Sequence, residues 1–197
     1  MIRKSTTRSR SRRAVLPVLP PHLWQAAVSF SARAHRHQVR RDGHTPYFAH
    51  PVRVMMTVVH VFGCTDEVTL CAALLHDTIE DTTTDYDDLA ERFGRAVADL
   101  VAVLTKNMAR PEPEREREYD ARLAKADWRA RLVKLADVYD NLCDVHTQPA
   151  EKVSQKRADA IEKCERALRL ARGDELEHEC TRRATRAIRE LVRANGG

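Results

Sequence analysis

The chain has 197 residues, of which 43% are hydrophobic and 32% are charged, and its formal net charge is +5. This length is enough to bury one hydrophobic core, so we expect one domain. No stretch reaches the roughly 20 consecutive apolar residues of a membrane span, and the N-terminus lacks the apolar run of a secretory signal. These features predict a cytoplasmic protein with no membrane partner.

The positive charge is concentrated at the N-terminus. Residues 1–15 contain six basic residues and no acidic one, whereas the rest of the chain has 28 basic and 29 acidic residues. A nearly neutral body is unlike a nucleic-acid-binding domain, so we expect no specific nucleic-acid partner. We predict a disordered basic tail over residues 1–15 and a single domain over residues 16–197.

Apolar residues recur at helical spacing along most of the chain, and no long segment alternates with period two. The sequence therefore predicts an all-α domain of about eight to ten helices. The first expected helix follows the Pro20-Pro21 pair and stops near the turn at residues 41–43. Pro51 suits the first position of a second helix, and Gly63 suits its C-terminal end.

The next two expected helices begin at threonine caps. Thr65 is the predicted cap of a helix that runs through Ile79, and Thr84 opens a short helix that Gly94 ends. A further helix has an apolar face made of Val97, Leu100, Val101 and Leu104.

Residues 107–120 differ from these segments because they hold two prolines and dense alternating charge. Such a composition cannot bury a core face, so it predicts an exposed connection or a frayed helix start. A long helix is expected from Leu123 to Leu142. Two C-terminal helices, over residues 149–173 and 174–194, complete the prediction.

One cluster of polar residues points to chemistry. His76, Asp77, Glu80 and Asp81 follow an apolar run and stand at positions i, i+1, i+4 and i+5 of an expected helix. Three neighbouring carboxylates repel one another, and burial makes their charges costly, so a divalent cation would explain them. The alternative is an acidic helix end that is simply solvated.

Two distant residues fit the same explanation. His50 stands directly before Pro51, and Asp137 interrupts an apolar helix face, so each needs a polar partner if it is buried. Together with His76 and Asp77 they form a set of two imidazoles and two carboxylates, which suits manganese, iron, zinc or nickel. The five cysteines contain no C-x-x-C pair, which disfavours a thiolate zinc site.

The order of these residues, His50, then His76-Asp77, then Asp137, resembles the HD superfamily of phosphohydrolases. A wider set of motifs within residues 33–145 is similar to the hydrolase domain of the RelA/SpoT alarmone enzymes. These motifs are Gln38-Val39-Arg40-Arg41-Asp42-Gly43, Pro46-Tyr47-Phe48-Ala49-His50-Pro51, Leu74-Leu75-His76-Asp77-Thr78-Ile79-Glu80-Asp81-Thr82, Phe93-Gly94, Leu104-Thr105-Lys106, and Lys134-Leu135-Ala136-Asp137 followed by Asn141-Leu142.

The resemblance implies a role for each matching residue. It implies that a metal ion, manganese in most of the family, is bound by His50, His76, Asp77 and Asp137. It implies that Glu80 and Asp81 act in catalysis, and that Arg40, Arg41 and Asn141 contact a guanine nucleotide. For the two arginines a solvated helix end remains the alternative. The chain departs from the family pattern at His37 and Val138, which raises a question about substrate preference.

The resemblance implies a stand-alone hydrolase that converts (p)ppGpp to GDP or GTP and pyrophosphate, because 197 residues leave no room for a synthetase domain. In this reaction the metal would lower the pKa of a water molecule, and Glu80 and Asp81 would orient that water and handle its proton. A second hypothesis is a phosphatase acting on another nucleotide, such as the 2′-phosphate of NADPH. A third is a module that binds the alarmone without cleaving it. A homo-oligomer is compatible with all three.

Overall fold

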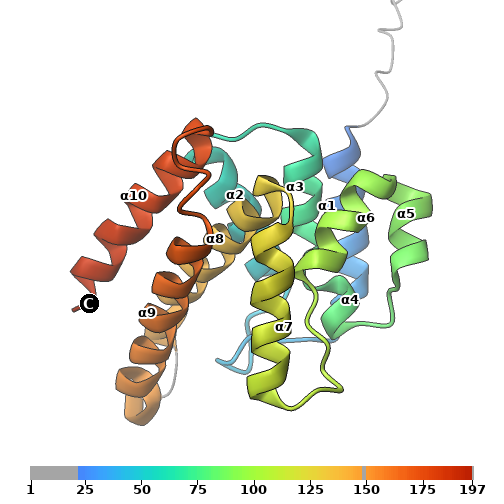
Figure 1. Ribbon diagram of the computed structural model, residues 1–197. Helices are drawn as coiled ribbons and strands as arrows, with labels where there is room; N and C mark the ends of the chain where they lie inside the picture. Colours follow the sequence, from blue (N-terminus) through green and yellow to red (C-terminus); the bar gives the residue numbers. More distant parts are fainter. Residues whose placement is uncertain (1–21, 148–149, 197) are drawn as a thin grey trace, which may run out of the picture.

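The structure, a computed structural model, describes residues 22–147 and 150–196. These residues form helices and contain no strand, which confirms the all-α prediction; one isolated β-bridge joins Val39 and Pro46. The predicted tail over residues 1–15 lies outside the described residues. The helices, shown in Figure 1, are α1 (Leu23–Ala34), α2 (Ala49–His60), α3 (Glu67–Leu75), α4 (Thr78–Asp81), α5 (Tyr86–Phe93), α6 (Arg95–Leu104), α7 (Glu112–Lys125), α8 (Trp128–Cys143), α9 (Val153–Leu170) and α10 (Glu179–Ala194).

Helix α3 lies at the centre of the fold. Every residue from Thr69 to Leu75 is buried, as expected for a short helix that is apolar on all sides. Helices α1, α2, α6 and α8 all pack against it. Because α3 is enclosed by neighbours, its C-terminal end is held in a fixed position.

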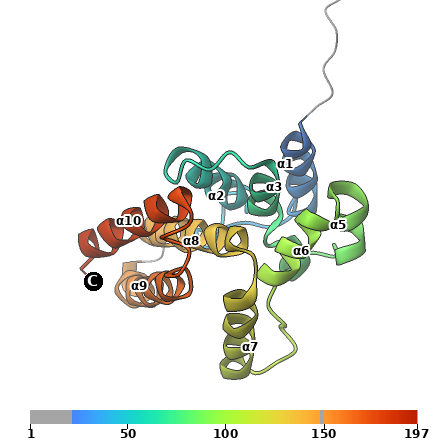
Figure 2. The same cartoon turned by 45° about the horizontal axis from the view of Figure 1, so that its top comes forward.

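Helix α8 connects the helices around α3 with the C-terminal helices. It contacts α2, α3 and α6, and it also contacts α9 and α10. Figure 2 shows α9 and α10 beside α8, while α7 projects away from the start of α8. The last turns of α3, the start of α2 and the middle of α8 consequently face one another.

The N-terminal caps differ from the predicted ones by one residue. Helix α3 is capped by Asp66 and not by Thr65, since the Asp66 side chain accepts a hydrogen bond from the Thr69 N–H at 2.8 Å. Helix α5 is capped by Asp85 and not by Thr84. In both cases an aspartate directly follows the threonine, and its carboxylate is also favoured by the helix dipole.

Helix α1 ends at Ala34, several residues before the predicted turn at residues 41–43. The chain then folds back on itself, with the Arg40 N–H donating to the Thr45 carbonyl at 2.7 Å and the Tyr47 N–H donating to the Gln38 carbonyl at 2.9 Å. Arg40 and Arg41 therefore lie on a loop and not at a helix end. Pro51 is the third residue of α2, which begins at Ala49.

The predicted single helix through residues 76–81 is interrupted. Helix α3 ends at Leu75 and α4 begins at Thr78, so His76 and Asp77 form the junction between them. The Thr78 hydroxyl donates to the Leu75 carbonyl at 2.7 Å and satisfies a carbonyl that the break leaves without a helical partner. This junction turns the polar residues away from the axis of α3.

The charged segment over residues 107–120 is more ordered than predicted. Helix α7 starts at Glu112, and its Tyr119 is only 3% exposed, so the prediction that this segment buries no core face is wrong. The predicted long helix from Leu123 to Leu142 is also wrong, because α7 and α8 are separated at Ala126-Asp127. Asp127 caps the N-terminus of α8, because its side chain accepts a hydrogen bond from the Arg129 N–H at 2.8 Å.

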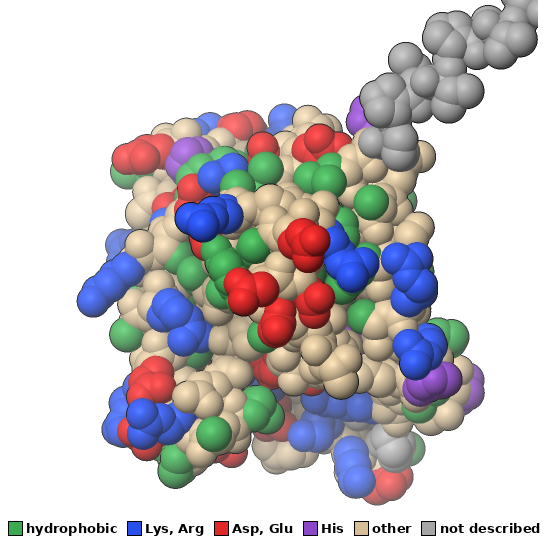
Figure 3. Space-filling view, turned by 90° about the vertical axis from the view of Figure 1, so that its right-hand side faces the viewer, with side chains coloured by type: hydrophobic (Ala, Val, Ile, Leu, Met, Phe, Trp, Pro, Cys, Tyr) green, Lys and Arg blue, Asp and Glu red, His purple; other side chains and the backbone are tan. Residues whose placement is uncertain are grey.

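The described helices and one face of the molecule reflect the composition of the chain. In the described part of the chain, no helix is both long and apolar enough to cross a bilayer. On the face shown in Figure 3, acidic and basic side chains are interspersed. This mixture agrees with the near-neutral charge of the chain after its first fifteen residues.

Candidate metal centre

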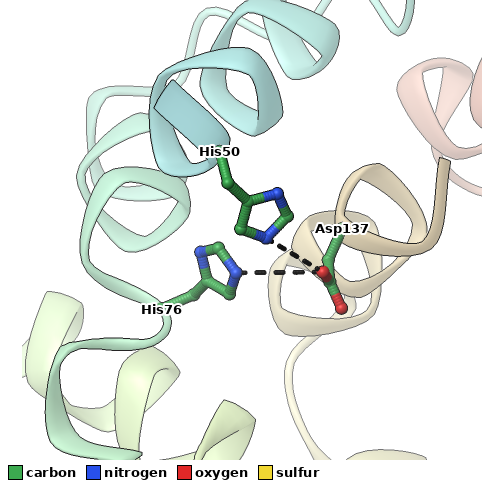
Figure 4. A group of neighbouring side chains, drawn as sticks. All are labelled: His50, His76 and Asp137. Atoms are coloured by element: carbon green, nitrogen blue, oxygen red, sulfur yellow. Dashed lines mark ion pairs between the residues drawn. The ribbon is translucent and has the colours of Figure 1, made fainter. Parts of the chain in front are cut away.

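Three side chains from separate parts of the chain point toward one another. His50 comes from the first turn of α2, His76 from the α3–α4 junction and Asp137 from α8 (Figure 4). Their candidate ligand atoms all lie within 4.8 Å of one another. Asp137 Oδ1 is 3.3 Å from His50 Nε2 and 4.0 Å from His76 Nε2.

Asp77 lies beside this group. Its Oδ2 atom is 3.1 Å from His76 Nε2 and 3.6 Å from His50 Nε2. The same oxygen accepts a hydrogen bond from the Tyr47 hydroxyl at 2.6 Å. The four residues expected from the sequence to bind metal are therefore together, and Tyr47 fixes the orientation of one carboxylate.

The two histidines are held in the tautomer that metal binding needs. His50 Nδ1 is 2.7 Å from a carboxylate oxygen of Asp140, and His76 Nδ1 is 2.8 Å from the Ala73 carbonyl. Because each neighbour is an acceptor, each Nδ1 donates a hydrogen bond to it, and Nε2 is the nitrogen that can bind a metal ion in exchange for its own proton. His76 Nε2 is buried and has no hydrogen-bond partner among the described residues. This donor set fits a divalent cation.

The electrostatics of the centre also favour a cation. Burial works against a charged His76, but the nearby carboxylates of Asp77 and Asp137 outweigh it and raise its pKa to about 9. Burial likewise works against charged carboxylates, yet the imidazoles of His76 and His50 hold the pKa of Asp77 below its usual value. Positive charge between these groups is therefore strongly stabilised.

Glu80 and Asp81 lie on α4, next to the centre but outside the ligand group. Glu80 accepts a hydrogen bond from the Lys106 N–H at 2.8 Å, and Asp81 accepts one from the Tyr47 hydroxyl at 3.1 Å. Burial raises the pKa of both carboxyl groups, and the charge of Asp77 raises both further. Both side chains line the same pocket as the four candidate ligands.

That pocket has a volume of about 410 Å³ and extends from the centre toward α7 and α9. Arg40, Arg41 and Asn141, for which the family resemblance implies contacts with the nucleotide, also line it. Asn141 donates to Asp137 Oδ1 at 2.5 Å and accepts from Arg40 at 3.2 Å. Arg40 also forms an ion pair with Asp144 at 2.8 Å, whereas Arg41 is exposed.

Comparison with known proteins places this arrangement in a family. The model of the HD domain matches residues 27–163. The chain belongs to the HD-domain family.

Relatives of this HD domain fall in its RelA/SpoT group. The human protein named guanosine-3′,5′-bis(diphosphate) 3′-pyrophosphohydrolase MESH1 is 42% identical over 132 residues, which cover 66% of this chain and 74% of the human one. The guanosine-3′,5′-bis(diphosphate) 3′-pyrophosphohydrolase of Aquifex aeolicus is 41% identical over 121 residues, 60% of this chain and 17% of that one. A solved structure of a metazoan SpoT orthologue, described as hydrolysing ppGpp, matches with a TM-score of 0.78 and 30% identity over 91% of this chain and 99% of that one.

Sequence reasoning missed three residues of the HD domain's centre. Asp140 orients His50 and also accepts two hydrogen bonds from Arg53, at 2.7 and 3.0 Å. Lys134 pairs with Asp137 Oδ2 at 2.7 Å, and Tyr47 contacts Asp77. Spacing on α8 was the available signal, because Lys134, Asp137 and Asp140 repeat every three residues and so share a face.

Proposed function

We propose that this HD domain hydrolyses the 3′-diphosphate of guanosine 3′,5′-bis(diphosphate) and of its 5′-triphosphate form. The products are pyrophosphate and GDP or GTP. One observation carries the proposal. In a chain 42% identical to a protein named for this reaction, four candidate metal ligands, two further carboxylates and three candidate nucleotide contacts line one pocket.

His50, His76, Asp77 and Asp137 would hold a divalent ion, and we propose Mn²⁺. Two imidazole nitrogens with two carboxylates suit this ion and leave room for water and phosphate oxygens. When bound, a divalent cation polarises a phosphate group and lowers the pKa of water. The chain's own contribution is to hold the ligand atoms in position through Asp140, the Ala73 carbonyl and Tyr47.

Glu80 and Asp81 are the proposed catalytic residues. Both are partly buried carboxylates beside the centre. Among the described residues, Glu80 accepts from the Lys106 N–H, and Asp81 accepts from the Tyr47 hydroxyl, which it shares with Asp77. The remaining oxygen lone pairs are free to accept hydrogen bonds from water. A carboxylate held in this way orients an attacking water molecule and accepts its proton.

Arg40, Arg41 and Asn141 form the proposed nucleotide-contacting wall. Planar guanidinium groups stack on bases, and Arg40 is kept in place by Asp144 and by Asn141. Asn141 also donates a hydrogen bond to Asp137, so one side chain connects the nucleotide-contacting wall with the metal centre. The nucleotide would then lie with its base on the arginines and its 3′-phosphates at the metal end.

The deciding experiment is product analysis on a panel of nucleotides with the manganese-loaded protein. We expect pyrophosphate from guanosine 3′,5′-bis(diphosphate), and no orthophosphate. If the protein releases orthophosphate from NADPH and does not react with the guanosine compound, it is a phosphatase that acts on another nucleotide. Tight binding of the guanosine compound without any product would indicate a binding module.

A further inference from the structure

The cations that line the pocket are not equally neutralised. Five of the seven form ion pairs with carboxylates, and two do not. The pairs are Arg40–Asp144 at 2.8 Å, Lys106–Glu116 at 2.6 Å, Lys134–Asp137 at 2.7 Å, Lys156–Asp159 at 3.3 Å and Arg166–Glu116 at 2.7 Å. Arg41 and Lys163 have no ion pair or side-chain hydrogen bond with any residue that the structure describes.

Lys163 lies on the face of α9 that borders the pocket. The lining residues Lys156, Ala160, Lys163 and Ala167 recur at helical spacing on this face. The two alanines are buried and small, and Lys163, an exposed residue, lines the pocket between them. Helix α9 packs against α8, which carries Asp137, and residues of both helices line the pocket.

The surroundings of Lys163 are cationic. Partial burial lowers the pKa of its amino group, the positive charges of Lys134, Lys106 and Arg41 lower it further, and the negative charge of Asp137 opposes them. Lys163 forms no ion pair with any described residue, so an anion that enters the pocket would stabilise its charge. The carboxylates Asp77, Glu80 and Asp81 line the same pocket.

The proposed substrate has two phosphate chains, and the metal centre accounts for only one of them. The 3′-diphosphate is the group that is cleaved. The 5′-phosphates carry further negative charges that the acidic metal end would repel. They need a cation of their own, and Lys163 is the pocket-lining cation that has neither an ion pair among the described residues nor a role assigned above.

We propose that Lys163 binds the 5′-phosphates of the nucleotide and so makes this enzyme prefer substrates phosphorylated at both ends. This inference rests on the proposed function. Lys163 would determine substrate specificity and would not take part in the reaction, since it contacts phosphates that are not cleaved. Its effect should therefore appear in KM and not in kcat.

The test compares two substrates, guanosine 3′,5′-bis(diphosphate) and guanosine 3′-diphosphate with a free 5′-hydroxyl. For Lys163→Ala we expect KM of the first to rise about tenfold or more, with kcat within about twofold, and KM of the second to stay unchanged. Lys163→Arg should restore most of the preference. Arg169→Ala is the matched control, because it removes one positive charge from the same helix at a residue outside the pocket lining.

The outcomes separate this inference from the function on which it rests. If Lys163→Ala changes KM of both substrates by the same factor, or of neither, Lys163 does not bind the 5′-phosphates. If the unaltered protein cleaves neither substrate, the proposed function fails and the inference fails with it. Unchanged circular dichroism and melting temperature of Lys163→Ala exclude an effect through unfolding.

Discussion

At the scale of single residues, the short segment from His76 to Asp81 combines two different proposed roles. His76 and Asp77 point to the candidate metal position, whereas Glu80 and Asp81 border it without joining the ligand group. The break between α3 and α4 separates the two pairs. Substitutions can therefore distinguish a metal ligand from a residue that handles water.

The double variant Glu80→Gln with Asp81→Asn keeps the size of both side chains and their ability to accept from the Lys106 N–H and Tyr47 hydroxyl. We expect kcat to fall about 10²-fold or more, with metal content and nucleotide affinity retained, because only the charges are lost. Metal stoichiometry, affinity and initial rate should be measured on one preparation. Turnover at the parental rate would remove the catalytic role, and loss of metal would make one of the two a ligand.

Asp140 provides a second test at this scale. Asp140→Ala leaves the buried His50 Nδ1–H and the Arg53 guanidinium without their acceptor. We expect metal affinity to fall about 10- to 100-fold, since such partners orient ligand imidazoles. Asp140→Asn retains an acceptor oxygen and should lose less. A metal titration of all three proteins measures this, and equal affinities would show that Asp140 does not position His50.

At the scale of elements, the helix ends decide where the polar residues lie. Helix α3 starts at a cap one residue later than the sequence suggested and stops before His76. Because α3 is buried on all sides, a weakened start should affect the stability of the whole domain. The neighbouring pair Thr65 and Asp66 allows a matched comparison.

Asp66→Ala removes the acceptor for the Thr69 N–H and Thr69 hydroxyl, at 2.8 and 2.6 Å. We expect the free energy of unfolding to fall by about 1 kcal/mol, the usual effect of losing an N-terminal cap. Thr65→Ala, at an exposed position, should change it by at most a few tenths of a kcal/mol. Urea unfolding of both variants measures the difference. A larger loss from Thr65→Ala would mean that threonine is the cap after all.

At the scale of the whole molecule, the candidate metal centre joins parts of the chain that are far apart in sequence. His50 belongs to α2, His76 to the α3–α4 junction and Asp137 to α8. An ion bound by all three stabilises the folded state by mass action, because the unfolded chain does not present the site.

Removal of metal by a chelator should abolish turnover and lower the melting temperature by several degrees, and Mn²⁺ should restore both. At a free metal concentration of 100 times Kd the stabilisation is about 2.7 kcal/mol. His76→Ala is the control, since its melting temperature should respond much less to added metal. Full activity of a protein shown by elemental analysis to contain no metal would reject the metal-dependent mechanism.

Much of this protein was predictable from local sequence patterns. Helical periodicity alone indicated an all-α domain, and the pattern around His50, His76-Asp77 and Asp137 identified side chains that the fold does bring together. Periodicity works because residues that must be buried recur at the spacing of the helix that carries them, whereas the distant site residues were linked by their resemblance to the HD superfamily. The ends of helices were predicted less well, because aspartate and threonine caps compete over a single residue.

Only the tertiary structure showed the features that depend on contacts between segments distant in sequence. The break at His76-Asp77 is buried against neighbouring helices, and Tyr119 enters the core from a segment whose composition indicates exposure. Asp140 became part of the centre because α8 packs against α2, and Lys163 came to line the pocket because α9 packs against α8. Periodicity states which face of a helix is buried, but only packing states which side chains it will meet there.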